Sequence, residues 1–182
     1  MVGVFQTVLR GTAIMFPLLF AAIAVNPKEA PAACGDDAGY HQLDFWLGSW
    51  QVFDKEGVLQ GANEIEKVLK GCLVVENWHG TASGEGKSWF YYNTHTKRWK
   101  QVWITTRAAE PGGMKEKELI ETFADGGVRF QGRIHVGTGQ TILDRTTLAP
   151  LPDGRVRQTI EISRNNGETW EPTFDAYYVR DD

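Results

Sequence analysis

The sequence predicts an all-β protein: an antiparallel up-and-down barrel of about ten strands, with one short helical turn before the first strand. Aromatic and β-branched runs begin at residue 50 and are interrupted by turn signals at regular intervals. Within several runs the residue character alternates with the period of two that a strand requires. No interval offers the apolar i, i+3, i+4 spacing of a crossover helix, so parallel pairing has no connector.

Turn signals divide the chain into strands. Nine of them, rich in Gly, Asn, Asp and Pro, separate the ten predicted strands. An open sheet of ten strands would leave two exposed edges, and closure into a barrel removes both. The signals lie at residues 54–57, 70–71, 80–86, 93–97, 107–115, 125–127, 136–139, 150–154 and 164–167.

The helical turn is predicted at residues 40–47, directly before the first strand. Leu43, Trp46 and Leu47 have helical spacing there. We expect this turn to close the bottom of the barrel with apolar side chains.

The first 24 residues have the features of a secretory signal peptide. Arg10 precedes an apolar run that ends in Ala22-Ile23-Ala24, a pattern suited to signal peptidase. This run is shorter than the ~20 residues that a membrane-spanning helix needs. We expect an exported protein, periplasmic or extracellular, with no stable membrane span in its mature form. The predicted organisation is a signal peptide at 1–24, an N-terminal arm at 25–39 and a lipocalin-like barrel domain at 40–182.

The charge of the mature chain argues against nucleic acid as a partner. Cleavage after residue 24 removes one cation, Arg10, and no anion, so the net formal charge changes from −4 to −5. Proteins that bind nucleic acid usually present a basic surface. We expect no nucleic-acid partner.

Both cysteines, Cys34 and Cys72, follow the predicted cleavage site. In an oxidising compartment, two cysteines in a small domain most simply form a disulfide. This bond would tie the N-terminal arm to the third strand. Two unpaired thiols are the alternative, and cleavage after Ala32 or lipidation of Cys34 also remain open.

The opening of the barrel carries a family resemblance. Gly48-Ser49-Trp50 matches the G-x-W with which lipocalins and their calycin relatives begin the first strand. The longer segment at 43–50, LDFWLGSW, resembles the opening of a group of uncharacterised exported bacterial lipocalin-like proteins. The resemblance implies the barrel fold and no particular activity, because the group has no agreed one. The likeness covers about residues 34–180, with further matching segments at 71–72, 76–78, 98–103, 151–158, 167–170 and 174–175.

The strand count distinguishes two kinds of relative. Lipocalins in the strict sense have eight strands followed by a helix, whereas this chain ends in a predicted strand at 170–180. Ten strands resemble fatty-acid-binding proteins and nitrobindins. Nitrobindins hold haem through a histidine in their C-terminal part, but the last histidine here is His135. The resemblance therefore implies no haem.

Sequence-local metal and hydrolase motifs are absent. The four histidines have neither H-x-H nor H-E-x-x-H spacing, and the cysteines form no C-x-x-C motif. No G-x-S-x-G elbow occurs. We expect neither a metal nor another cofactor.

A segment near the C-terminus predicts a structural turn. Residues 163–170, SRNNGETW, resemble the Asp-box hairpin of sialidases, with Asn165 where aspartate is usual. Asn166-Gly167 favours a turn with positive φ, and Trp170 is expected to pack under the hairpin. We assign no chemistry to this segment.

Polar residues in phase with apolar ones define the candidate site. Glu76 shares a strand face with Trp78, Gln101 with Trp103, and Gln158 with Ile160. If these faces point inward, the barrel holds an aromatic-walled cavity with a few fixed hydrogen-bonding groups, as small-molecule sites do. The predicted ligand-binding residues are Glu76, Trp78, Tyr92, Gln101, Trp103, Gln158 and Tyr178.

An inward carboxylate has a raised pKa unless it is paired. Arg129 or Arg133, on the strand predicted at 128–135, could pair with Glu76.

Three functions are consistent with this pattern. The first is a binding protein for a small, largely apolar ligand. The second is an isomerase or cyclase that uses the same cavity, with Glu76 as the candidate general acid or base. The third is a structural or envelope-interaction module in which polar groups satisfy one another inside a filled core.

Overall fold

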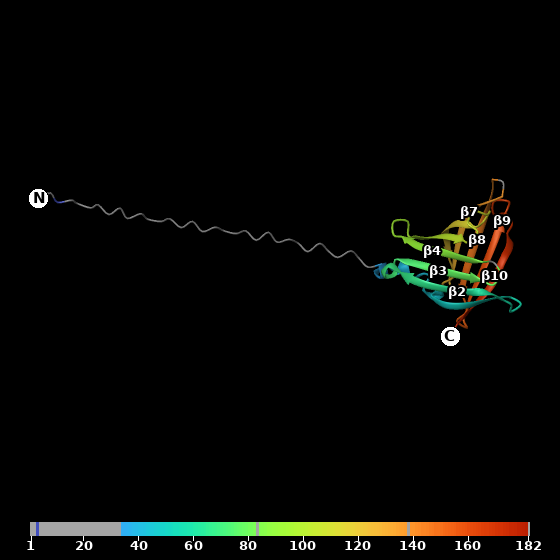
Figure 1. The fold of residues 1–182 in the computed structure, drawn as a ribbon, viewed down its shortest axis with the longest axis horizontal. Coiled ribbons are helices and arrows are strands. Elements are labelled where there is room, and N and C mark those ends of the chain that lie inside the picture. Colours follow the sequence, from blue (N-terminus) through green and yellow to red (C-terminus); the bar gives the residue numbers. More distant parts are fainter. Residues whose placement is uncertain (1–2, 4–33, 83, 138, 182) are drawn as a thin grey trace. The chain divides into compact units, whose positions relative to one another are not determined.

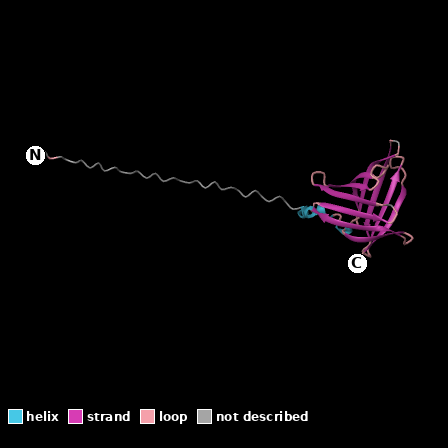
Figure 2. Cartoon of the chain, viewed as in Figure 1, coloured by secondary structure: helices cyan, strands magenta, loops and turns pink. Residues whose placement is uncertain are grey.

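Ten strands form one closed antiparallel barrel (Figures 1 and 2), which confirms the predicted fold class. The computed structural model describes residue 3 and residues 34–82, 84–137 and 139–181. Each strand pairs with its neighbours along the chain, and β1 pairs with β10 to close the barrel. The strands are β1 (Gly48–Asp54), β2 (Leu59–Val68), β3 (Leu73–Gly80), β4 (Glu85–Asn93), β5 (Arg98–Thr105), β6 (Met114–Thr122), β7 (Val128–Val136), β8 (Gln140–Pro150), β9 (Val156–Ser163) and β10 (Glu171–Arg180).

The connections between strands fall at the nine predicted turn signals. The β9–β10 hairpin shows the turn chemistry that the sequence predicts. Asn166 and Gly167 have φ of 58° and 97°, and the Asn165 Oδ1 accepts from the Thr169 backbone N–H at 2.9 Å. Trp170 donates its indole N–H back to the Gly167 carbonyl at 3.2 Å. This hairpin is a structural element.

Short 3₁₀ helices cover one end of the barrel, which we call the floor; the opposite end is the mouth. Leu43 and Trp46 are fully buried there. The Trp46 ring packs edge-to-face on Phe90 and Tyr178, with centroids 5.5 and 6.0 Å away. The predicted helical turn before the first strand is confirmed. The 3₁₀ helices are η1 (Cys34–Asp36), η2 (Ala38–His41), η3 (Asp44–Trp46) and η4 (Leu69–Gly71).

The contact between the first and last strands is completed by side chains at the floor. Trp50 is buried, and the Arg180 guanidinium lies 4.4 Å from its ring centroid. The same guanidinium donates to the Leu47 carbonyl at 3.1 Å. Gly48 has φ of 124°, and a Cβ there would lie 2.5 Å from Arg180. Glycine at this position therefore allows both the backbone conformation and the arginine contact.

Strands β6 and β7 are paired along only part of their length. The register joins Glu118–Thr122 to Val128–Gln131, with a bulge between Leu119 and Glu121. Among the described residues, no ladder pairing joins the mouth-side segments at 114–117 and 132–136. A surface cleft of about 580 Å³ borders this seam, and Lys115 lines it.

A disulfide joins Cys34 to Cys72, as predicted. It ties η1 to the residue directly before β3 and closes a loop with a sequence separation of 38. In the chain-entropy model a loop of this length stabilises the fold by about 4 kcal/mol. The Sγ atom of Cys34 is used in this bond, which is incompatible with lipidation of the same atom.

The predicted signal peptide at 1–24 lies outside the described residues apart from Gly3, as does the predicted arm before Cys34. In the part of the chain that the structure describes, no helix has the length and apolar character needed to cross a membrane.

Candidate functional site

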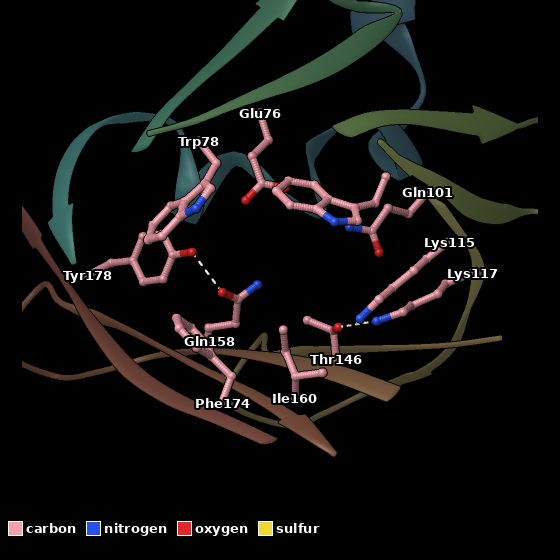
Figure 3. Close-up of a pocket in the computed structure, with 11 residues that line it drawn as sticks. Glu76, Trp78, Gln101, Lys115, Lys117, Thr146, Gln158, Ile160, Phe174 and Tyr178 are labelled. Carbon is pink, nitrogen blue, oxygen red and sulfur yellow. Dashed lines mark hydrogen bonds between the residues drawn. The ribbon is translucent and has the colours of Figure 1, made fainter. Parts of the chain in front are cut away.

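A cavity of about 230 Å³ lies inside the barrel in the half nearer the mouth (Figure 3). The floor half is filled by side chains, including Trp46, Phe90 and Phe130. The barrel interior is therefore filled by side chains at the floor end and contains a cavity at the mouth end. The cavity is lined by Glu76, Trp78, Gln101, Trp103, Lys115, Lys117, Thr146, Gln158, Ile160, Phe174 and Tyr178.

Six of the seven predicted ligand-binding residues line this cavity, and Tyr92 does not. Tyr92 lies next to the floor end of β4, which terminates at Asn93. Its ring contacts Tyr40 and Trp99 at centroid distances of 5.1 and 5.7 Å. Tyr92 is buried on the inner face of β4, but alternation along a strand does not give the height along the barrel axis. Tyr92 thus belongs to the floor.

Aromatic side chains form part of the cavity wall. Trp78 on β3 meets Phe174 on β10 edge-to-face, with centroids 6.4 Å apart. Trp103 on β5 is accommodated by Gly86 on β4, where a Cβ would lie 2.4 Å from the indole ring. A flat apolar ligand can pack against such surfaces.

Glu76 is buried among hydrogen-bond donors. Its Oε2 accepts from the Ser88 hydroxyl at 2.6 Å, and its Oε1 accepts from the Asn63 Nδ2 at 2.8 Å. Glu76 and Ser88 are direct cross-strand partners on β3 and β4, while Asn63 comes from β2. Both carboxylate oxygens are therefore already engaged by the protein.

The hydrogen bonds continue from Glu76 to two glutamines on opposite walls. Asn63 also donates to the Tyr178 hydroxyl at 3.2 Å, which donates to the Gln158 Oε1 at 2.7 Å. On the other side the Gln101 Nε2 donates to the Ser88 Oγ at 3.1 Å. When Glu76 is ionised it only accepts hydrogen bonds, and it then sets the direction of every bond in this network.

This direction decides which amide atoms remain for a ligand. Because the Gln158 Oε1 accepts from Tyr178, its Nε2 is left pointing into the cavity (Figure 3). The Gln101 Oε1 is buried and has no hydrogen-bond partner among the described residues. One wall therefore offers a donor and the other an acceptor.

Two lysines form the wall opposite Trp78 and are paired with a buried aspartate, Asp144 (Figure 3). The Lys115 ammonium donates to the Asp144 Oδ2 at 2.8 Å. Lys117 forms an ion pair with the Asp144 Oδ1 and donates to the Thr146 Oγ1 at 2.5 Å. Asp144 is fully buried, and two cations share its single carboxylate.

Gly132 makes this cluster possible. It lies on β7, between the lysines of β6 and Asp144 of β8, and Asp144 is its cross-strand partner. A Cβ at Gly132 would lie 1.9 Å from the Glu116 carbonyl oxygen. Only glycine allows β6 to approach β7 so closely at this point.

The predicted pairing of Glu76 with Arg129 or Arg133 is wrong. Arg129 donates to Glu121 at 2.8 Å, and Arg133 donates to Asn166 at 2.6 Å. Odd-numbered positions of β7 point outward, whereas the inward positions include Val128, Phe130 and Gly132. The cation that acts on Glu76 is Lys117 of β6.

Burial and charge shift the acid–base properties of these groups. Burial raises the pKa of Glu76 above its ordinary 4.5, against the opposing effects of Ser88, Asn63 and Lys117. Burial lowers the pKa of Lys117 to about 8, although Asp144 attracts the proton.

The other two groups are held in one protonation state. Burial opposes ionisation of Asp144, but Lys117 and Lys115 outweigh it and keep the Asp144 pKa below 3.8. Burial and Glu76 raise the pKa of Tyr178 well above 10.0.

Five lining residues are not among the seven predicted ligand-binding residues, although Ile160 was predicted to share the inward face of Gln158. For the lysines a signal exists: Lys115 and Lys117 are in phase with the apolar Leu119 on β6. Lysine side chains are normally in contact with water, so a lysine in the inward phase of a strand is not recognised as a lining residue from the sequence. Asp144 is likewise in phase with Ile142 and Leu148. These five lining residues are Lys115, Lys117, Thr146, Ile160 and Phe174.

No protein-family model and no curated protein matches this chain. The functional proposal therefore depends on the geometry of the cavity.

The buried carboxylate leads to a pH-dependent prediction. Above about pH 4.5 an unfolded Glu76 ionises, whereas the folded protein, with its raised pKa, resists ionisation. The native state then binds more protons than the unfolded state, so this residue's contribution to stability is lost as the pH rises through the folded pKa.

Glu76→Gln removes that loss, and we expect its unfolding free energy to increase relative to wild type by up to about 1.4 kcal/mol per pH unit above 4.5. Urea unfolding from pH 4.5 to about 7 measures this. Glu64→Gln, at an exposed position of β2, is the control and should follow wild type. Parallel curves for wild type and Glu76→Gln would contradict the prediction.

Proposed function

We propose that this protein binds a small, largely apolar molecule in the mouth half of its barrel. The observation that supports this most directly is the coexistence of a filled floor and a cavity of about 230 Å³ within one barrel. A purely structural module has no need for the cavity, since small barrels fill their interiors with side chains.

The size of the cavity limits the ligand. At ~30 Å³ for each water molecule, the space corresponds to about eight waters. Ligand pockets for drug-sized molecules begin at about 300 Å³. A compact molecule with on the order of ten non-hydrogen atoms fits better than a long lipid chain.

The proposal includes export and a lipocalin-like ancestry. The Cys34–Cys72 disulfide fits an oxidising compartment, in agreement with the signal-like sequence at 1–24. The closed barrel and the G-x-W at Gly48–Trp50 support the resemblance to exported bacterial lipocalin-like proteins.

Titration with 3-phenylpropan-1-ol, a neutral aromatic probe of suitable size, tests the binding site. Trp103 lines the cavity, so we expect the probe to quench tryptophan fluorescence of the wild type. Trp103→Ala should weaken binding about tenfold, the effect of losing about 1.4 kcal/mol of aromatic contact.

Trp89→Ala is the matched control, because Trp89 lies on the outer face of β4 and is 37% exposed. It should leave the affinity unchanged. Equal affinities of Trp103→Ala and wild type, or no binding to either, would refute the proposed site. Native mass spectrometry of the protein purified from its own host identifies any co-purified molecule.

A further inference from the structure

The cavity offers more hydrogen-bond donors than acceptors. Each lysine ammonium has three N–H groups. The contacts of Lys115 with Asp144, and of Lys117 with Asp144 and Thr146, use at most two of them on either side chain. The Gln158 Nε2 adds further donors. The Gln101 Oε1 is the one buried lining acceptor that lacks a partner among the described residues. A ligand group that only accepts hydrogen bonds complements this set.

The charged side chains at the cavity also favour an anionic ligand. Lys115 and Lys117 share the carboxylate of Asp144, so this wall carries one positive charge in excess. Glu76, a carboxyl group that lines the cavity, acts on Lys117 from a distance but is engaged by Ser88 and Asn63 on a different wall. No ion pair joins Glu76 to either lysine among the described residues. Buried charges are stable only when they are paired. The two lysines therefore have one direct counter-ion between them, Asp144, and leave a site for a monovalent anion.

The donors line one cavity. In Figure 3 the ends of Lys115 and Lys117 lie beside Thr146, and the Gln158 amide nitrogen points into the cavity from the other side of Ile160. The aromatic residues Trp78 and Phe174 lie on the side opposite the lysines, and Gln158 lies next to Phe174. A ligand with an anionic end and a flat apolar end would satisfy both sides.

We propose that the ligand is a small monocarboxylic acid with a compact aromatic or aliphatic body, whose carboxylate binds to Lys115, Lys117 and the Gln158 amide. This inference rests on the proposed function and assigns the chemical class of its ligand. A divalent anion such as a phosphate monoester fits less well, because its second charge would have no cation.

Binding of the acid should weaken as the pH rises. The titratable groups that line the cavity are Glu76 from β3, Lys115 and Lys117 from β6 and Tyr178 from β10. Asp144 from β8 lies buried behind the two lysines. Lys117 loses its proton near pH 8, and Glu76 becomes anionic as it ionises, so both changes disfavour an anion. Asp144 stays ionised and Tyr178 stays neutral, because their pKa values lie far below and far above this range.

A matched pair of probes tests the proposal by calorimetric titration: 3-phenylpropionate and 3-phenylpropan-1-ol. We expect the wild type to bind the acid at least about tenfold more tightly than the alcohol at pH 7. The acid affinity should decrease between pH 6 and pH 9, whereas the alcohol affinity should stay constant.

Lys117→Met should reduce the preference for the acid about tenfold, and Lys115→Met should act in the same direction. Lys100→Met, on the outer face of β5, is the control and should retain the full preference. If a cavity variant fails to fold, the acid-to-alcohol ratio of the wild type and its pH dependence still decide the matter.

The outcomes separate this inference from the proposed function. If the alcohol binds and the acid binds no more tightly, the carboxylate site is refuted, whereas the proposed binding of an apolar molecule in the cavity is supported. Failure of both probes to bind overturns both proposals. A preference for the acid that survives equally in Lys115→Met and Lys117→Met overturns the assignment to these lysines.

Discussion

Asp144→Asn should destabilise the protein by about 3–5 kcal/mol, because it leaves two ammonium groups in the barrel without their shared counter-ion. Asp144 is completely buried, so it is exposed neither to solvent nor to the cavity. Lys117 is almost completely buried beside it. Lys115 is 21% exposed and keeps some contact with solvent, so most of the cost falls on the buried Lys117. Denaturant unfolding at pH 7 measures the effect.

Asp175→Asn is the control for this experiment. Asp175 forms a bidentate pair with Arg157 at 2.8 and 2.7 Å, but both side chains are partly exposed on the barrel surface. Exposed pairs contribute about 0–1 kcal/mol. If the two variants lose similar stability, the Asp144 cluster does not behave as a buried ion pair.

Non-additivity provides a second check. Replacement of Asp144 by Leu together with Lys115→Met and Lys117→Met should cost less than Asp144→Asn alone, because no buried charge is left unpaired. A triple variant that loses more than the single variant would contradict this account of the cluster.

Trp46→Ala should cost about 3–5 kcal/mol, which is typical for loss of a fully buried aromatic side chain. The Trp46 ring fills the space between Phe90 and Tyr178 at the floor. Since Tyr178 also reaches Gln158 at the cavity, collapse at the floor should also loosen the binding site. Thermal and urea unfolding measure the stability.

Trp46→Phe distinguishes packing from hydrogen bonding. The Trp46 Nε1 is buried and has no hydrogen-bond partner in the described part of the chain. Phenylalanine keeps the edge-to-face contacts and removes this unpaired donor, whose burial costs about 1–3 kcal/mol. We expect a loss of under about 2 kcal/mol. A loss equal to that of Trp46→Ala would show that the indole nitrogen has an essential partner.

The wall of the cavity shows how far alternation predicts a binding site. Gln101 and Trp103 are on the same face of one strand, and the period of two is enough to place both inward. Tyr92 on β4 also faces inward, yet it lies in the floor. Alternation along a strand does not report the height of a residue along the barrel axis. Height depends on which strands pair and on their register.

The lysines show the opposite failure. Lys115 and Lys117 have the phase of inward residues, but a charged side chain is normally found in water. Their burial depends on Asp144, which is distant in sequence, and on Gly132 on the intervening strand. No local pattern reports such a pairing.

The sequence alone determined the antiparallel barrel, its ten strands and the helical turn before them, because period-two alternation and turn chemistry are local properties. It also predicted the disulfide from the two cysteines, and the structure decided between that bond and two free thiols. The tertiary structure alone decided which part of the lumen is filled and which is open. It also decided that two lysines and an aspartate meet inside the barrel. These features arise from contacts between strands distant in sequence, and they set the charge of the cavity and the ligand that we propose for it.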